Sequence, residues 1–161
     1  MKIVFVLPTF NPGGAENVMV RLANHFQAQY DVHILVIKGG GILQENIRQS
    51  IPVHDLKCDR VRHAFGLLRG RIKSLEPDIV FSSISRLNIL LSLIRLSLRE
   101  KFRLILREVN TPSVALQATG SPGLYKFLYK LLYPRAEVII CQSDDMLGEM
   151  QTEIGLVKNK L

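Results

Sequence analysis

The stretch that most constrains the fold of this chain is residues 2–21, KIVFVLPTFNPGGAENVMVR. It opens with five consecutive apolar residues, from Ile3 to Leu7. Such a run, without polar alternation, is typical of a central parallel strand that is covered on both faces. Residues 8–14 contain two prolines and two adjacent glycines, and apolar residues then recur at helical spacing as far as Phe26. The stretch predicts a strand, a glycine loop and a helix.

The glycine loop has the features of an anion site. Gly13 and Gly14 lack a Cβ, so the backbone can adopt a positive φ and a ligand can approach closely. The helix that follows offers unpaired N–H groups and the positive end of its dipole. A tight turn without any ligand explains the glycine pair about equally well. Glu16 would repel a phosphate placed too near, and it can instead accept a hydrogen bond from a sugar hydroxyl.

Two familiar glycine motifs do not fit the sequence. A P-loop requires Lys and then Ser or Thr after its last glycine, and neither Gly13 nor Gly39 is followed by this pattern. A dinucleotide fingerprint requires G-x-G-x-x-G and an acidic residue that ends the second strand, where this chain has Ile37 and Lys38. The sequence therefore supports neither an ATPase nor a dehydrogenase.

The composition is that of one globular domain. The 161 residues are 47% hydrophobic and 22% charged, which allows a substantial core. Cys58 and Cys141 lie far apart without metal-ligand spacing, and the chain enters a strand directly after Met1. We therefore expect a reduced, cytoplasmic protein with no metal site. The longest apolar-rich segment, residues 87–98, is shorter than the ~20 residues that a membrane span needs.

Strands and helices are expected to alternate along the rest of the chain. The three glycines at 39–41 are interpreted as a flexible surface connection rather than a second phosphate loop, and residues 113–123 as a mobile loop. The alternation predicts an α/β fold, a doubly wound parallel sheet of about six strands with helices on both faces. The expected later strands are 32–37, 51–56 at an edge, 79–81, 104–106 and 138–140, and the expected helices are 60–75, 86–99, 124–133 and one capped by Ser143.

Polar loops follow several of these strands. In a parallel sheet the carboxyl ends of the strands share one edge, and ligands bind beyond that edge. The loops expected to meet there are residues 11–14, residues 82–86, residues 107–111 and Ser143. The sequence predicts one binding edge built from these four loops.

The net charge of +7 favours anionic partners. Nucleic acid is the weakest candidate, because the arginines are not interleaved with exposed aromatic residues and no recognised nucleic-acid motif is present. An anionic membrane is a stronger one. Basic residues decorate residues 60–73, and Tyr125, Tyr129 and Tyr133 alternate with lysines on a leucine-rich helix. A core helix with solvated lysines explains these tyrosines as well and is the favoured interpretation.

Four segments, in this order, resemble the N-terminal, acceptor-binding domain of a retaining GT-B glycosyltransferase of the family 4 type. They are PTFNPGGAENVMVRLANHF, EPDIVFSSISRLN, LREVNTP and AEVIICQSDDM, and the resemblance covers essentially the whole chain. It implies that residues 1–161 form the Rossmann-like half of a GT-B fold. A C-terminal nucleotide-sugar domain would then be absent from this chain, and the chain alone is expected to be inactive.

The resemblance implies a function as well as a fold. The full-length protein would be a hexosyltransferase that moves a sugar from a nucleotide sugar to a glycan or lipid-linked acceptor in polysaccharide or cell-surface glycan synthesis. The nucleotide sugar is a co-substrate held mainly by the second domain, and no other cofactor is implied. An undecaprenyl-type carrier would place the protein peripherally on the inner face of the membrane. The alternative is a non-catalytic, flavodoxin-like module that binds a phosphorylated small molecule.

The resemblance also assigns site residues. Family members often place a histidine after the fifth strand, where this chain has Val109, so Glu108 beside it becomes the candidate catalytic residue. Pairing of Glu108 with Arg107 or a nearby lysine is the structural alternative. The expected substrate-binding residues are Asn11, Gly13, Gly14, Glu16, Arg86, Asn88, Asn110 and Ser143.

Overall fold

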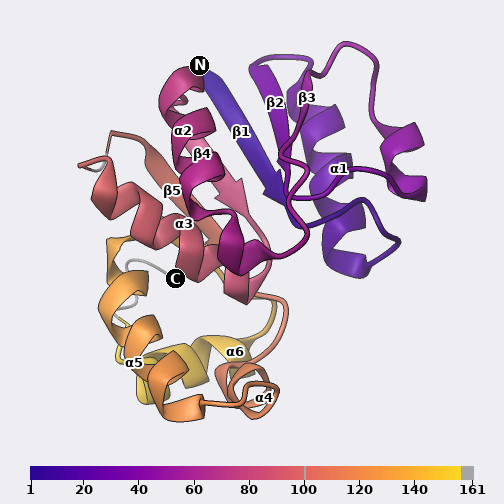
Figure 1. Ribbon diagram of the computed structural model, residues 1–161. Coiled ribbons are helices and arrows are strands. Elements are labelled where there is room, and N and C mark those ends of the chain that lie inside the picture. The colour runs from indigo at the N-terminus through magenta and orange to yellow at the C-terminus, as the bar shows by residue number, and fades with distance from the viewer. Residues whose placement is uncertain (100, 157–161) are drawn as a thin grey trace.

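The computed structural model describes residues 1–99 and 101–156 and contains one six-stranded sheet (Figure 1). All five strand pairs are parallel, and the strand order is β3-β2-β1-β4-β5-β6. The predicted doubly wound α/β fold is therefore confirmed. The strands are β1 (Lys2–Leu7), β2 (Asp31–Val36), β3 (Val53–Asp55), β4 (Ile79–Ser82), β5 (Arg103–Arg107) and β6 (Val138–Ile140).

Helices cover both faces of this sheet, as Figure 1 shows. Helix α1 and the short η1 pack on one face, while α2, α3 and α5 pack on the other. Helices α4 and α6 lie together beyond the end of the sheet (Figure 1). The helices are α1 (Gly14–Phe26), η1 (Ile42–Asn46), η2 (Val61–His63), α2 (Phe65–Leu75), α3 (Ser85–Ser97), α4 (Pro112–Gln117), α5 (Pro122–Leu132), η3 (Tyr133–Arg135), α6 (Asp144–Glu149) and η4 (Met150–Ile154).

Strand β1 is the centre of the molecule. Its register places Val6 beside Leu35 of β2 on one side and beside Ser82 of β4 on the other. Val4 and Val6 face the core under α2 and α3, whereas Phe5 and Leu7 face the core under α1. The unbroken apolar run is explained by this position, because side chains on both faces of β1 are buried.

Of the three glycines between β2 and β3, Gly41 packs closely against the backbone of another loop, while Gly40 is exposed and has no close neighbour. Gly41 has φ 113°, and a Cβ placed on it would lie 2.6 Å from the backbone carbonyl of Phe10. The Leu43 N–H also donates to the Phe10 carbonyl at 3.1 Å. Gly41 is therefore needed for close approach to the loop that follows β1.

The expected loop at residues 113–123 is wrong in its first half, which forms α4. Thr111 has extended backbone geometry at the N-cap, and Pro112 occupies the first turn, where its missing N–H costs nothing. Ala115, Leu116 and Gln117 then have good helix propensity. Pro112 therefore starts a helix here.

The tyrosines of residues 125–133 belong mainly to the core. Tyr129 and Tyr133 are only 1% and 0% exposed, and Tyr125 is half-buried. The core interpretation is confirmed for these side chains. The exposed apolar side chains of α5 lie on another face of this helix. Within the two described stretches, no helix combines the length and apolarity needed to cross a membrane.

Candidate functional site

The sheet contains a topological switch between β1 and β4. From β1 the chain moves outward through β2 to β3, and it then returns to β4 and moves outward the other way to β6. Ligands of doubly wound sheets bind at the carboxyl ends of the strands beside such a switch. Here Pro8 and Glu16 from the β1 side lie against Ser83 and Ile84 from the β4 side, around a space too small for a water molecule. The loop after β1 and the loop after β4 therefore meet, as predicted.

The glycine loop differs in detail from the expected phosphate cradle. Gly13 caps α1 with φ −132° and ψ 155°, and the positive-φ glycines of the described chain do not include Gly13 or Gly14. The expected use of positive φ is therefore wrong. The Glu16 carboxylate lies over Gly13, in the space that a Cβ on Gly13 would occupy. Because this carboxylate already faces the α1 N-terminus, a phosphate would meet repulsion unless Glu16 turned away.

Glu108 lies at the end of β5, where its completely buried side chain belongs to a polar network. Its carboxylate accepts hydrogen bonds from Ser85 Oγ at 2.7 Å, from Asn88 Nδ2 at 2.8 Å and from the Tyr133 hydroxyl. Its own N–H donates to the Ile140 carbonyl at 3.0 Å. The side chain is 0% exposed, so it touches α3 and η3 rather than solvent. This geometry supports a positioning role, in which Glu108 joins α3 and η3 to the end of β5.

Burial controls the protonation of this network. Desolvation raises the pKa of the Glu108 carboxyl, and the hydrogen bonds from Tyr133, Ser85 and Asn88 oppose that rise. Burial, followed by the nearby Glu108 charge, raises the pKa of the Tyr133 hydroxyl well above 10.0. Tyr133 therefore remains a hydrogen-bond donor to Glu108 under all physiological conditions.

The raised pKa of Glu108 predicts a pH dependence of stability. Since the folded protein holds this proton to higher pH than the unfolded chain, the stabilising contribution is complete below the unfolded pKa of ~4.3 and is lost as pH rises through the folded pKa. In the Glu108→Gln variant, the free energy of unfolding should not fall in this way as the pH rises. Urea unfolding from pH 4 upward compares the two proteins. A parallel pH profile for the variant and the wild type would contradict the assignment.

Arg107 does not pair with Glu108, in contrast to the structural alternative considered from sequence. Its guanidinium donates to Ser83 Oγ at 2.9 Å and to Gln142 Oε1 at 2.6 Å. Gln142 Nε2 in turn donates to the Glu108 backbone carbonyl at 2.8 Å. These bonds join the ends of β4, β5 and β6 into one rigid edge. The only signal for them in the sequence was the polar run that follows each strand.

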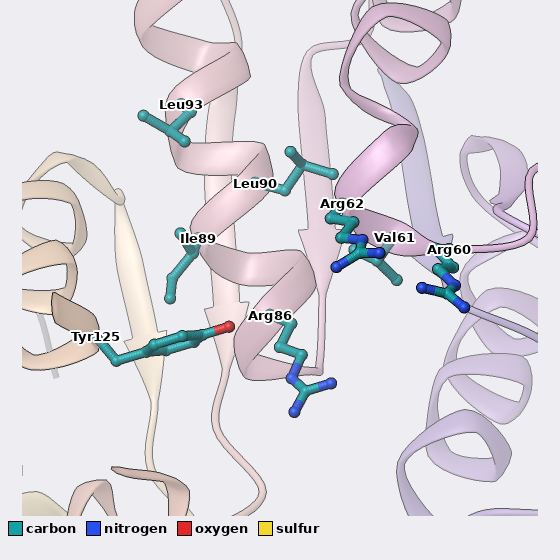
Figure 2. Close-up of a pocket in the computed structure, with 8 residues that line it drawn as sticks. All are labelled: Arg60, Val61, Arg62, Arg86, Ile89, Leu90, Leu93 and Tyr125. Atoms are coloured by element: carbon teal, nitrogen blue, oxygen red, sulfur yellow. The ribbon is translucent and has the colours of Figure 1, made fainter. Parts of the chain in front are cut away.

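Two adjacent cavities open beside this edge. The smaller, of about 290 Å³, lies between α3, α4 and α5 and is lined by Ser85, Arg86, Asn110 and Tyr125 among others. The larger, of about 660 Å³, is a groove between η2 and α3 (Figure 2). Arg86 and Tyr125 line both cavities. The two cavities are therefore neighbours at the N-terminal end of α3, with Arg86 and Tyr125 between them.

The larger groove combines cations with an apolar wall. Arg60 and Arg62 project from η2 and its preceding residue, while Ile89, Leu90 and Leu93 line it along α3 (Figure 2). Sequence reasoning noted the basic character of residues 60–73 but missed that two of the arginines face α3. No local pattern in the sequence was available as a signal, because the contact joins η2 to the distant α3.

Residues 12–161 match the family model described as Glycosyltransferase Family 4. The chain belongs to this family.

Two curated proteins of Campylobacter jejuni are similar to this Family 4 chain. The protein named N-acetylgalactosamine-N,N'-diacetylbacillosaminyl-diphospho-undecaprenol 4-alpha-N-acetylgalactosaminyltransferase is 25% identical over 174 residues, which cover 99% of this chain and 46% of that protein. The protein named GalNAc-alpha-(1->4)-GalNAc-alpha-(1->3)-diNAcBac-PP-undecaprenol alpha-1,4-N-acetyl-D-galactosaminyltransferase is 27% identical over 157 residues, covering 92% of this chain and 40% of that protein. The chain spans less than half the length of either relative.

Solved structures show the same fold. The crystal structure of Anabaena HepE in complex with UDP and glucose superposes with a TM-score of 0.72 at 17% identity, over 95% of this chain and 41% of that chain. The apo form of the lipopolysaccharide outer core galactosyltransferase WaaB gives a TM-score of 0.65 at 11% identity, over 99% of this chain and 44% of that chain. At these identities the likeness concerns the fold alone.

The Family 4 fold brings only some of the predicted site residues to one place. Arg86 and Asn110 are exposed and line the smaller cavity together. Asn88 lies beneath it, fully buried, and its amide donates to Glu108 and to the Arg107 carbonyl. Asn88 therefore supports the cavity from below, and in this conformation it does not line it.

The remaining predicted residues lie at the same sheet edge of this Family 4 domain but outside the two cavities. Asn11 and Gly14 are exposed, and Gly13 and Glu16 are half-buried in the loop and first turn of α1. Ser143 is the N-cap of α6, where its Oγ accepts from the Met146 N–H at 3.2 Å. The cap was predicted, and it uses one acceptor position of the hydroxyl, whose O–H stays available as a donor.

Proposed function

We propose that this chain is the acceptor-binding half of a retaining glycosyltransferase that transfers a sugar from a nucleotide sugar to a lipid-linked glycan. The observation that carries the proposal is a pair of adjacent cavities at the carboxyl edge of a Family 4 sheet, the larger of which combines three arginines with an apolar wall. The printed names of both C. jejuni relatives place their acceptors on an undecaprenol diphosphate. Such an acceptor has an anionic and an apolar part, which suit the arginines and the apolar wall of the larger groove.

The proposed reaction requires little acid–base chemistry from this half. An acceptor hydroxyl attacks the anomeric carbon of the donor, and the bond from that carbon to the nucleoside diphosphate breaks. If the departing phosphate oxygen accepts the hydroxyl proton, the nucleophile and leaving group share one face of the sugar and configuration is retained. The contribution of Arg86, Asn110 and the glycine loop is then to hold the acceptor in line with the donor. A nucleotide-sugar domain supplies the other wall of the cleft.

A turnover assay tests this division of labour. The 161-residue chain, incubated with a prenyl-diphosphate-linked N-acetylhexosamine and a panel of UDP- and GDP-sugars, should form no glycosidic product. When it is joined to the donor domain of a Family 4 enzyme, product should form, and NMR should show the anomeric configuration of the donor. Turnover by the 161-residue chain alone, or an inverted product, would contradict the proposal.

We also propose that the domain binds peripherally to the anionic inner face of the membrane through α5. Leu124, Phe127 and Leu131 are 57%, 59% and 44% exposed, and their i, i+3, i+7 spacing places them in one stripe. The tyrosines, which first suggested a membrane, are not part of this stripe. The exposed Lys130 lies in the same helix, as interfacial helices commonly have.

Replacing this stripe should release the domain from membranes. The double variant Phe127→Ser/Leu131→Ser removes two large apolar side chains, so co-sedimentation with phosphatidylglycerol vesicles at low salt should fall by about tenfold or more. Ile42→Ser is the matched control, because Ile42 is 68% exposed on η1, which packs on the opposite face of the sheet. Wild-type protein that does not sediment with these vesicles would refute membrane binding.

A further inference from the structure

We infer that the groove between η2 and α3 is a subsite for a diphosphate group that carries an apolar chain. The inference rests on the proposed function and specifies where the carrier of the acceptor is held. It assigns the diphosphate to Arg60, Arg62 and Arg86, and it assigns the first part of the chain to Ile89, Leu90 and Leu93. These six residues line one groove of about 660 Å³ (Figure 2).

The three arginines are available for an anion. All three are exposed, and none of them forms a salt bridge with a carboxylate in the part of the chain that the structure describes. The Arg62 Nε donates only to the neighbouring His63 ring at 3.1 Å. Guanidinium groups bind phosphate oxygens through parallel, charge-assisted hydrogen bonds, so three of them suit a group with two phosphates better than a single phosphate.

The charged and the apolar residues lie toward different ends of the groove. Arg86 lies in the first turn of α3, whereas Ile89, Leu90 and Leu93 follow along the helix, and Figure 2 shows the arginines gathered near one end of the groove and Leu93 near the other. The distance along α3 from Arg86 to Leu93 is about 10 Å. The positive end of the α3 dipole adds to the arginines at the first end. An anion is therefore favoured at the sheet edge, and an apolar chain is favoured away from it.

The position of Arg86 connects this groove with the site of transfer. Arg86 and Tyr125 also line the smaller cavity that contains Asn110. A diphosphate at this junction would send its apolar chain along α3 and its sugar toward Asn110 and the carboxyl edge of the sheet. That arrangement matches the order of parts in a glycan linked through diphosphate to a lipid.

Calorimetric titration of the 161-residue chain tests the subsite with three probes. Farnesyl diphosphate, which has both parts, should bind most tightly, and inorganic pyrophosphate should bind about tenfold or more weakly because it lacks the chain. The Arg60→Ala/Arg62→Ala variant should weaken the binding of both probes by about tenfold or more. Leu93→Gln should weaken only the binding of farnesyl diphosphate. Phosphatidylglycerol vesicles, the third probe, should bind the arginine variant nearly as well as wild type.

Matched variants keep these outcomes interpretable. Arg48→Ala removes one arginine charge at an exposed position beside Asn24 of α1, and it should leave all three affinities unchanged. Urea unfolding should show that the arginine variants remain folded, since the arginines removed are exposed. The same measurement checks the folding of the Leu93→Gln variant. Farnesyl diphosphate that fails to bind, or that binds equally well to the arginine variant, would overturn the subsite. So would a loss of vesicle binding in that variant without any farnesyl diphosphate binding, because the groove would then hold a lipid headgroup.

The subsite and the proposed function fail in different ways. If the arginine variant binds farnesyl diphosphate normally while the chain joined to a donor domain still transfers sugar, only the subsite is wrong. If farnesyl diphosphate binding depends on the arginines and no sugar is transferred to any lipid-linked acceptor, only the proposed reaction is wrong.

Discussion

Replacing Glu108 with alanine should destabilise the domain by about 4 kcal/mol. The substitution leaves the buried Asn88 and Tyr133 donors and the half-buried Ser85 hydroxyl without their acceptor, and each unsatisfied buried donor costs about 1–3 kcal/mol. The space left by the carboxyethyl group adds a cavity term. For a domain of this size, that loss corresponds to a fall of about 10 °C in Tm. Urea and thermal unfolding followed by circular dichroism measure both quantities.

The Glu108→Gln variant distinguishes the effect of lost hydrogen bonds from the effect of lost side-chain volume, because glutamine has nearly the size of glutamate. Glutamine keeps one carbonyl acceptor for Asn88 or Tyr133, and the Ser85 hydroxyl can rotate to accept from its amide. The expected loss is therefore only about 1 kcal/mol. If Glu108 acted instead as a catalytic group, the glutamine variant would lose turnover in the complete enzyme while its stability and substrate affinity remained unchanged. A loss of less than about 1 kcal/mol in the alanine variant would also contradict the network.

Replacing Gly41 with alanine should cost about 3 kcal/mol or more. Gly41 has φ 113° and ψ 155°, a backbone region that is essentially restricted to glycine and costs other residues about 1–3 kcal/mol. In addition, the new methyl group would lie 2.6 Å from the backbone carbonyl of Phe10, and backbone cannot move aside as a flexible side chain can. Phe10 is completely buried and precedes the glycine loop, so the strain reaches the wall of the proposed cleft.

Gly40→Ala is the matched control for this contact. Gly40 also has a positive φ, 84°, but nothing lies within 4 Å of a Cβ placed on it. The Gly40→Ala variant should therefore lose only the conformational term, about 1–2 kcal/mol of stability. The difference between the two variants, measured by urea unfolding, reports the contact between Gly41 and Phe10. Equal losses at the two positions would show that the contact contributes nothing.

The sequence was sufficient for the sheet and for the edge that holds the site. The apolar run of β1 identified a central strand, and the regular alternation of elements identified a parallel sheet, whose carboxyl edge necessarily collects the loops after β1, β4, β5 and β6. Ser143 was recognised as a cap because Ser followed by acidic residues is a local signal. These features depend on neighbours in the sequence, which is why they were predictable.

The parts of the site that were missed depend on contacts between distant residues. Glu108 was considered with its neighbour Arg107, but its partners lie 20 to 25 positions away in α3 and η3. Likewise, Arg60 and Arg62 line a groove only because η2 packs beside α3, and no local pattern in the sequence reveals that packing. Helix α4 is six residues long, too short for a clear helical period.

We propose that this chain binds the acceptor and leaves the donor to another domain. The most direct test is a pair of calorimetric titrations of the 161-residue chain, one with a prenyl-diphosphate-linked N-acetylhexosamine and one with the UDP- and GDP-sugar panel. We predict that the lipid-linked acceptor binds about tenfold or more tightly than any nucleotide sugar, since its diphosphate and apolar chain each add binding energy. Tight binding of a nucleotide sugar, or of a free phosphorylated sugar, with no binding of the lipid-linked acceptor would contradict the claim and favour a module for phosphorylated small molecules.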